Sequence, residues 1–219
     1  MYTISDVYDL DHTLAADYLK QFTWPWEALK GISAFIVELG QTLDPAEYTE
    51  VSEHVWVHKT ATVAPTAYLG APCIIGAGTE VRHCAFIRGS ALVGENCVVG
   101  NSVELKNVIL FDKVQVPHYN YVGDSILGYK AHMGAGSITS NVKSDKTLVV
   151  IHGQQDIPTG IKKVGAMLGD GVEVGCNSVL NPGTVIGRGS QVYPLSCVRG
   201  VIPANRIYKT GGIIVSKEV

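Results

Sequence analysis

Bulky apolar residues recur at every sixth position along the middle of the chain. A smaller or apolar residue stands two positions before each of them, from Val55 to Ile109. Both sets are expected to point inward, and the Gly residues that often follow the bulky position, as at Gly70 and Gly94, suit corners of the backbone. The first run has no gap: Val57, Val63, Leu69, Ile75, Val81, Ile87, Val93, Val99, Leu105 and Phe111.

A period of six matches neither the helical period of about 3.6 residues nor a simple alternation of two. It is typical of a parallel β-helix built from hexapeptides, in which three hexads close a coil of about 18 residues. The period therefore predicts an all-β protein whose central domain, residues 51–200, is a parallel β-helix. It returns later in the chain at Leu168, Val174, Leu180, Ile186, Val192 and Val198.

Two interruptions break this period. In residues 115–121, Pro117 occupies an expected apolar position, and the period resumes at Tyr121, Leu127 and Met133. The second interruption is longer: about 23 residues, roughly 143–164, leave the coil in a pattern that predicts a strand, a turn and a returning strand. This segment is either a tolerated surface insertion or a loop that reaches a neighbouring subunit or covers a site.

The segments outside the repeat differ from it. Residues 1–50 favour helices, because Leu10, Leu14, Tyr18 and Phe22 recur at four-residue spacing, and a short stretch begins with Pro25 and ends at a glycine. We expect these residues to form a short helical cap over the open end of the β-helix, which would otherwise expose strand edges. Residues 201–219 form a C-terminal tail that is a second candidate cap.

Composition narrows the class of protein. The chain has 24 Gly, 17% charged residues and a formal net charge of −3, so no overall basic field favours nucleic acid or an anionic membrane as a partner. No apolar run approaches the ~20 residues of a membrane span, and the N-terminus lacks the order of a signal peptide. We therefore expect a soluble cytoplasmic protein. The five cysteines form no CxxC pair, and Cys73 and Cys97 occupy inward positions expected in the core.

Two cations stand out against this low charge. Arg88 and Lys106 each follow a bulky position and lie one coil of about 18 residues apart, so they should stack in one column. Neighbouring cations repel unless an anion lies beside them, and a phosphate would bind both through charge-assisted hydrogen bonds. The alternative is a pair of independently solvated surface cations.

His118 lies inside the first interruption. An imidazole, with an ordinary pKa near 6.5, suits a general base at neutral pH, although a single histidine is equally compatible with a surface role. The histidine spacing of the zinc-binding hexapeptide proteins is absent, so we expect no metal site.

Two segments carry a resemblance to a known family. The stretch from Val116 to Ser125, which contains Pro117 and His118, and the stretch from Gly134 to Asn141 resemble the acetyltransferase domain of bifunctional glucosamine-1-phosphate N-acetyltransferase and N-acetylglucosamine-1-phosphate uridyltransferase. The archaeal sugar-1-phosphate nucleotidylyltransferase/acetyltransferase type is most similar, because it shares the long insertion. The resemblance extends over residues 50–205.

The resemblance implies a left-handed parallel β-helix, a homotrimer with active sites between subunits, and acetyl-CoA-dependent N-acetylation of an amino-sugar 1-phosphate, with glucosamine 1-phosphate as the leading acceptor. Such a reaction belongs to UDP-N-acetylglucosamine or cell-envelope precursor synthesis. It also implies residue roles. These are the catalytic base His118; Asn141 near the reacting amine and acetyl group; Arg88, Lys106, Tyr121 and Lys146 for the sugar phosphate; Ala135, Cys176 and Pro194 in the acetyl-CoA groove; and Arg206 near the CoA phosphates.

Departures from the family leave the acceptor open. His132 stands where the family usually has an Asn that contacts the sugar, and Val142 replaces a frequent aromatic residue. The 50 residues before the repeat are too few for the nucleotidyltransferase domain of the longer proteins, so we expect no nucleotidyltransferase activity. Two alternatives remain: acetylation of another amino-sugar acceptor, and a non-catalytic trimer that partners a separate nucleotidyltransferase.

Overall fold

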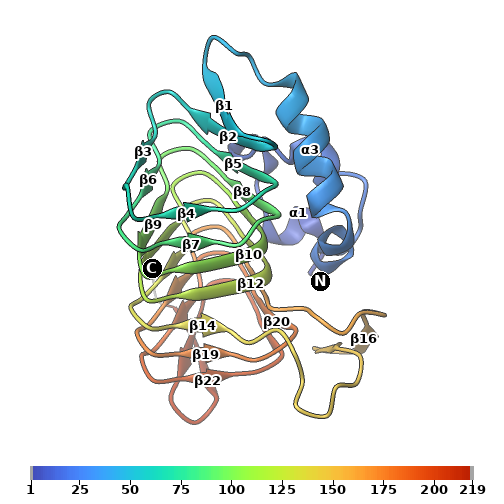
Figure 1. Cartoon of the computed structure of the whole chain (residues 1–219). Helices are drawn as coiled ribbons and strands as arrows, with labels where there is room; N and C mark the ends of the chain where they lie inside the picture. Colours follow the sequence, from blue (N-terminus) through green and yellow to red (C-terminus); the bar gives the residue numbers. More distant parts are fainter. Residues whose placement is uncertain (1, 218–219) are drawn as a thin grey trace.

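Short parallel strands wind around three flat faces in the computed structural model, which describes residues 2–217 (Figure 1). The first face stacks β2 (Val55–His58), β5 (Cys73–Ile75), β8 (Ala91–Val93), the second halves of β10 (Glu104–Leu110) and β12 (Tyr121–Leu127), β17 (Ala166–Leu168), β20 (Thr184–Ile186) and β23 (Val201–Ile202). This arrangement confirms the parallel β-helix.

The other two faces complete each coil. The second face stacks β3 (Thr62–Val63), β6 (Glu80–Val81), β9 (Val98–Asn101), β11 (Gln115–His118), β13 (His132–Met133), β18 (Glu173–Val174), β21 (Gln191–Val192) and β24 (Arg206–Lys209). The third face stacks β4 (Tyr68–Leu69), β7 (Phe86–Ile87), the first halves of β10 and β12, β14 (Ile138–Thr139), β19 (Val179–Leu180) and β22 (Cys197–Val198).

The inward positions build the core. Cys73 and Cys97 are 0% and 1% exposed, as the repeat predicts, and the bulky residues Ile87 and Leu105 are fully buried. The period itself shortens after Leu105. Leu110, rather than Phe111, is paired with Val93, so this coil has 17 residues instead of 18, and the next coil is shortened in the same way.

The shortening explains why the predicted phase is wrong at three positions, Phe111, Pro117 and Tyr121. Val116, and not Pro117, pairs with Val99 and points inward, while Val122 is fully buried and Tyr121 faces outward. The interruption placed at residues 115–121 is therefore a consequence of two missing residues, one upstream and one downstream of it, each at the corner between the third and first faces. Leu105 and Leu110 are five positions apart there, where Ile87 and Val93 are six apart.

The insertion leaves the β-helix at this same corner, one coil further on. Ile138 pairs with Val179, which lies 41 positions later, whereas a regular coil of this protein takes 18. The additional 23 residues contain the predicted hairpin, formed by β15 (Val150–His152) and β16 (Asp156–Pro158), and it protrudes from the body (Figure 1). Its base is closed by an antiparallel bridge between Val142 and Lys163.

The expected helical segment is present and covers a flank of the β-helix rather than its open end (Figure 1). It lies against the outward side of the first face, where the middle residue of each strand is apolar and buried: Ile74, Leu92, Ile109, Ile126 and Met167. Its elements are α1 (Ile4–Val7), η1 (Leu10–His12), α2 (Ala16–Leu19), η2 (Pro25–Lys30) and α3 (Ile32–Thr42).

Antiparallel strands close both ends of the stack. At the first end, β1 (Tyr48–Ser52) pairs with β2, and at the last end β25 (Ile213–Ser216) pairs with β24. Each covers part of the exposed edge of its terminal coil.

The first residues of the chain reach past the insertion. The backbone N–H of Asp9 donates to the Asp170 carboxylate at 2.7 Å, and the Arg188 guanidinium donates to the Ser5 carbonyl at 3.2 Å. The Tyr8 hydroxyl donates to the Ile126 carbonyl, in a coil that precedes the insertion. This segment therefore contacts coils on both sides of the insertion.

Candidate active site

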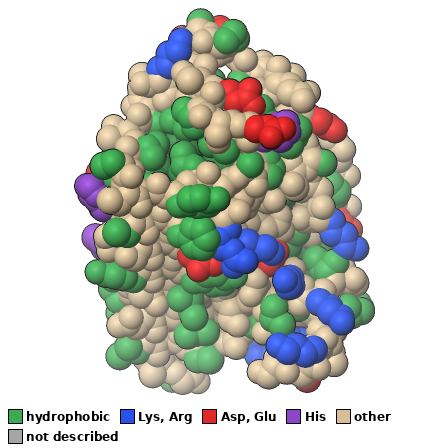
Figure 2. Space-filling view, viewed as in Figure 1, with side chains coloured by type: hydrophobic (Ala, Val, Ile, Leu, Met, Phe, Trp, Pro, Cys, Tyr) green, Lys and Arg blue, Asp and Glu red, His purple; other side chains and the backbone are tan. Residues whose placement is uncertain are grey.

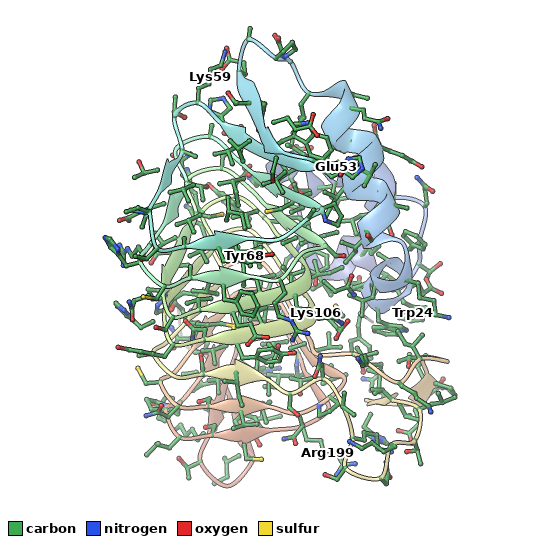
Figure 3. All side chains as sticks on the ribbon, in the orientation of Figure 1. Trp24, Glu53, Lys59, Tyr68, Lys106 and Arg199 are labelled. Atoms are coloured by element: carbon green, nitrogen blue, oxygen red, sulfur yellow. The ribbon has the colours of Figure 1, made fainter. Side chains whose placement is uncertain are left out.

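Polar side chains gather at the corner between the third and first faces, where Lys106 lies (Figure 3). Lys106 is in register with Arg88 in the coil before it and with Gly123 in the coil after it, so the predicted column is present. Tyr121 and Asn141 complete the group, since the Asn141 amide donates to the Tyr121 hydroxyl at 3.2 Å. Four of the residues predicted to form the site thus lie together. We call them, with Glu104, Asn107 and Asp124, the corner cluster.

Asp124 is the centre of the corner cluster. Its carboxylate is 3% exposed and accepts hydrogen bonds from Lys106 Nζ at 2.9 and 3.2 Å and from Asn107 Nδ2 at 2.9 Å. The Asn141 amide donates to it as well. A buried carboxylate is stable only with such partners, because desolvation penalises its charge. The carboxylate therefore ties three successive coils together.

Arg88 and Lys106, the two cations of the column, already form ion pairs with protein carboxylates, and the 18-residue spacing alone does not predict these pairs. Arg88 Nη1 donates to Glu104 Oε1 at 2.8 Å, and Lys106 pairs with Asp124. The hydrogen bond and charge of Glu104 raise the pKa of Arg88. Burial, and secondly the charge of Asp124, raise the pKa of the Tyr121 phenol, which stays protonated at neutral pH. Arg88 still has four further N–H donors for a ligand.

Local backbone geometry produces the cluster. At the shortened corner, β10 and β12 each run through the bend as one strand, with the bend made by a single left-handed residue, Asn107 (φ 54°) or Asp124 (φ 48°). Asn and Asp tolerate this conformation better than other non-glycine residues. The sequence signal for this corner is a spacing of five instead of six between inward residues. It occurs between Leu105 and Leu110 and again between Val122 and Leu127.

His118 lies at a different corner, between the second and third faces. Its carbonyl accepts from Gly136 N at 3.0 Å, and its side chain is exposed. The left-handed residue Tyr119 turns the chain after His118, and the third face then lies between His118 and Gly123. Within one chain, the third face therefore separates the predicted base from the corner cluster.

The candidate acetyl-CoA residues share the corner of His118. Backbone N–H groups of successive coils donate to the carbonyls of one column, which runs His83, Asn101, His118, Ala135 and Cys176 and continues to Pro194. We call this the histidine column. Cys176 and Pro194 line a hollow of about 240 Å³ together with Tyr193, Glu173 and His132. The three residues that the resemblance implies for the acetyl-CoA groove, Ala135, Cys176 and Pro194, therefore lie with His118 on one strip of the surface.

Three other predicted residues lie outside the corner cluster. His132, expected to contact the sugar, pairs with Glu173 on the second face, with Nδ1 and Oε2 2.7 Å apart. Lys146 lies in an exposed turn of the insertion, and its backbone N–H donates to Lys143. Arg206 begins β24 and donates to Ser216 across the terminal hairpin. No contact places any of them beside Lys106.

Residues 2–217 offer neither a cluster of metal-binding side chains nor a membrane-spanning helix. These residues hold no group of three or more His, Cys, Asp or Glu side chains arranged to bind a metal ion. No helix in the same range is long and apolar enough to cross a membrane. A hollow of about 690 Å³ is lined by residues of the N-terminus, the hairpin turn and the last coils, and by none of the predicted site residues.

The fold and repeat together define a hexapeptide-repeat β-helix protein, and the family can be stated. Residues 72–186 match the model of the GMPPB C-terminal domain, which is just over half of the chain, so the protein belongs to this family. The matched range contains the whole corner cluster and most of the histidine column.

Curated relatives agree with the resemblance seen in the sequence. The bifunctional protein GlmU of Methanococcus maripaludis is 28% identical over 204 residues, covering 92% of this chain and 50% of the relative. GlmU of a Nostoc species is 32% identical over 171 residues, covering 77% and 33%. The bifunctional sugar-1-phosphate nucleotidylyltransferase/acetyltransferase of Sulfurisphaera tokodaii is 31% identical over 109 residues, covering 49% and 27%. The chain spans half or less of the length of these relatives.

Solved structures with a related chain path include a hexapeptide transferase family protein from Anaplasma phagocytophilum. It is 15% identical, with a TM-score of 0.43, and the match covers 74% of this chain and 78% of the other.

Proposed function

We propose that this chain is an acetyl-CoA-dependent N-acetyltransferase that acts on an amino-sugar 1-phosphate, with glucosamine 1-phosphate as the leading acceptor. The observation that carries the proposal is the corner cluster, in which Arg88, Lys106, Tyr121 and Asn141 lie together. Relatives named as bifunctional nucleotidylyltransferase/acetyltransferases support the same class of reaction.

The site would be completed by a second copy of the chain. His118 and Lys106 lie at opposite corners of the third face, which exposes Tyr68 and Phe86 at 60% and 44%. In a homotrimer, the histidine column of one subunit would lie opposite the corner cluster of the next. An exposed aromatic face of this kind is consistent with such packing.

In this arrangement the acceptor phosphate would bind at the corner cluster, with the amine toward His118 of the neighbouring subunit. His118 would accept the amine proton as the nitrogen attacks the thioester carbonyl carbon. A backbone N–H would stabilise the oxyanion; the C–S bond then breaks, and CoA leaves as the thiol after it takes up a proton. Cys176 and Pro194 would line the groove for acetyl-CoA.

The test is a thiol-release assay with acetyl-CoA and a panel of acceptors. Glucosamine 1-phosphate should turn over faster than galactosamine 1-phosphate, a nucleotide-linked amino sugar and unphosphorylated glucosamine. Equal rates with unphosphorylated glucosamine would refute the role of the phosphate. A preference for another phosphorylated amino sugar would change only the acceptor, which is open because His132 stands where the family usually has an Asn that contacts the sugar. No thiol release with any acceptor would favour the non-catalytic trimer.

A further inference from the structure

A second group of cations surrounds a hollow beside the corner cluster. The hollow has a volume of about 300 Å³ and is open to the surface. Its walls come from the helical N-terminal segment, the shortened corner and the returning strand of the insertion. They consist of Leu29, Lys30, Asn107, Asp124, Ile161, Lys162 and Lys163.

The three lysines of this hollow differ from the column cations in their charge balance. Among residues 2–217, no carboxylate lies within 4 Å of the ammonium groups of Lys30, Lys162 or Lys163, whereas Arg88 and Lys106 each have one. Asp124 reaches the hollow, but its charge is already shared among Lys106, Asn107 and Asn141. The hollow therefore carries an excess of positive charge, and Figure 2 shows Lys and Arg side chains gathered along this side of the molecule.

Backbone hydrogen bonds fix two of these lysines beside the cluster. The Val164 N–H donates to the Asn141 carbonyl at 3.1 Å, and the Gly165 N–H donates to the Asp124 carbonyl at 2.7 Å. Gly165 is required at this approach, since a Cβ there would lie 2.1 Å from the Gly123 carbonyl oxygen. The insertion thus rejoins the β-helix beside Asp124, and Lys162 and Lys163 line the same hollow as Asp124.

Resting on the proposed function, we propose that this hollow binds the phosphate of the acceptor, and that Lys30, Lys162 and Lys163 supply the charge that Arg88 and Lys106 share with protein carboxylates. A sugar monophosphate carries between one and two negative charges at neutral pH and accepts several charge-assisted hydrogen bonds. The role of the insertion is then to provide two phosphate-binding lysines to a corner that has only compensated cations.

The experiment is direct binding of glucose 1-phosphate, which has the phosphate but no amine and so cannot be acetylated. Titration calorimetry on the full chain compares wild type with Lys162→Gln/Lys163→Gln and with Lys30→Gln. The matched control is Lys113→Gln/Lys130→Gln, which removes two lysines next to Tyr129, away from the hollow. We expect the Lys162/Lys163 variant to bind at least about tenfold more weakly, Lys30→Gln to be weakened in the same direction, and the control to match wild type.

Each outcome decides between the two proposals. Unchanged binding in both hollow variants, or no binding by wild type at millimolar concentration, would overturn the role of the hollow. Equal weakening by the control variant would reduce the effect to general surface charge and would overturn it too. Selective weakening together with no acetyl transfer to any acceptor would support the hollow and refute the proposed reaction.

Discussion

The Asp124 carboxylate accepts both of its Lys106 hydrogen bonds from the adjacent coil, so one buried anion fixes the cation that is proposed to meet the substrate. Replacing Asp124 with Asn keeps the size and the tolerance for a left-handed backbone, but removes the charge and points an amide at groups that are themselves donors. We expect a loss of about 1–3 kcal/mol in the free energy of unfolding, measured by urea denaturation.

Glu104→Gln is the control for this variant. The Arg88–Glu104 pair is exposed to solvent, which screens its attraction, so its loss should destabilise the protein much less than the loss of the Asp124 charge. Equal destabilisation by the two substitutions would mean that Asp124 is not the structural centre of the cluster.

His118→Ala should lower turnover about 100-fold or more, because general-base catalysis contributes at that level. The substitution lies on an exposed side chain, so the size of the assembly, measured by light scattering, should not change. His83→Ala provides a matched control, since His83 belongs to the same histidine column two coils earlier. Near-normal acetylation by His118→Ala would exclude it as the base.

Leu92→Ala should cost about 2–4 kcal/mol of unfolding free energy, although Leu92 points away from the interior of the β-helix. The reason is that α3 covers this side chain, which is fully buried. Val98→Ala, at a half-buried outward position on the second face of the same coil, should cost much less. Thermal or chemical unfolding of the two variants tests whether the helical segment is part of the core.

The five thiols should fall into two classes in alkylation at pH 8. Burial raises the pKa of Cys73 and Cys97 to about 12, and only the thiolate reacts, so these two should react only after unfolding. Cys176 is exposed and should react in the native protein. Coenzyme A should slow its alkylation and leave exposed Cys84 unaffected, as followed by peptide mass spectrometry. Equal rates for Cys176 with and without coenzyme A would remove it from the candidate groove.

The repeat predicted the β-helix because its inward positions depend only on local spacing. Its limits are equally physical. A coil one residue short keeps an apolar residue near the expected position, so Phe111 fitted the pattern although the chain had already slipped by one, and the slip became visible only at Pro117. The spacing placed Arg88 above Lys106 correctly, but the Glu104 and Asp124 partners depend on which way side chains turn at a bend.

The sequence also contains a sign that the N-terminal helices cover the first face, but it can be recognised only once the strands are assigned to faces. Its strands carry an apolar residue at the outward position, as at Ile74 and Ile109, where the second face has Glu80 and Gln115. Without the fold, nothing assigned these positions to one side. The separation of His118 from Lys106 was not predicted either, because the six-residue period does not say which of the three corners of a coil a residue occupies.

The N-terminal residues that contact both sides of the insertion affect how the molecule comes apart. In a β-helix each coil touches only its neighbours, and the coils before and after the 23-residue insertion remain paired directly, as Leu127 is with Leu168 and Ile138 with Val179. Ser5 and Asp9 hold Arg188 and Asp170 beyond the break, while Tyr8 holds Ile126 before it. These contacts add a second link across the insertion, so that separating the coils there would break the N-terminal hydrogen bonds as well as the strand pairing.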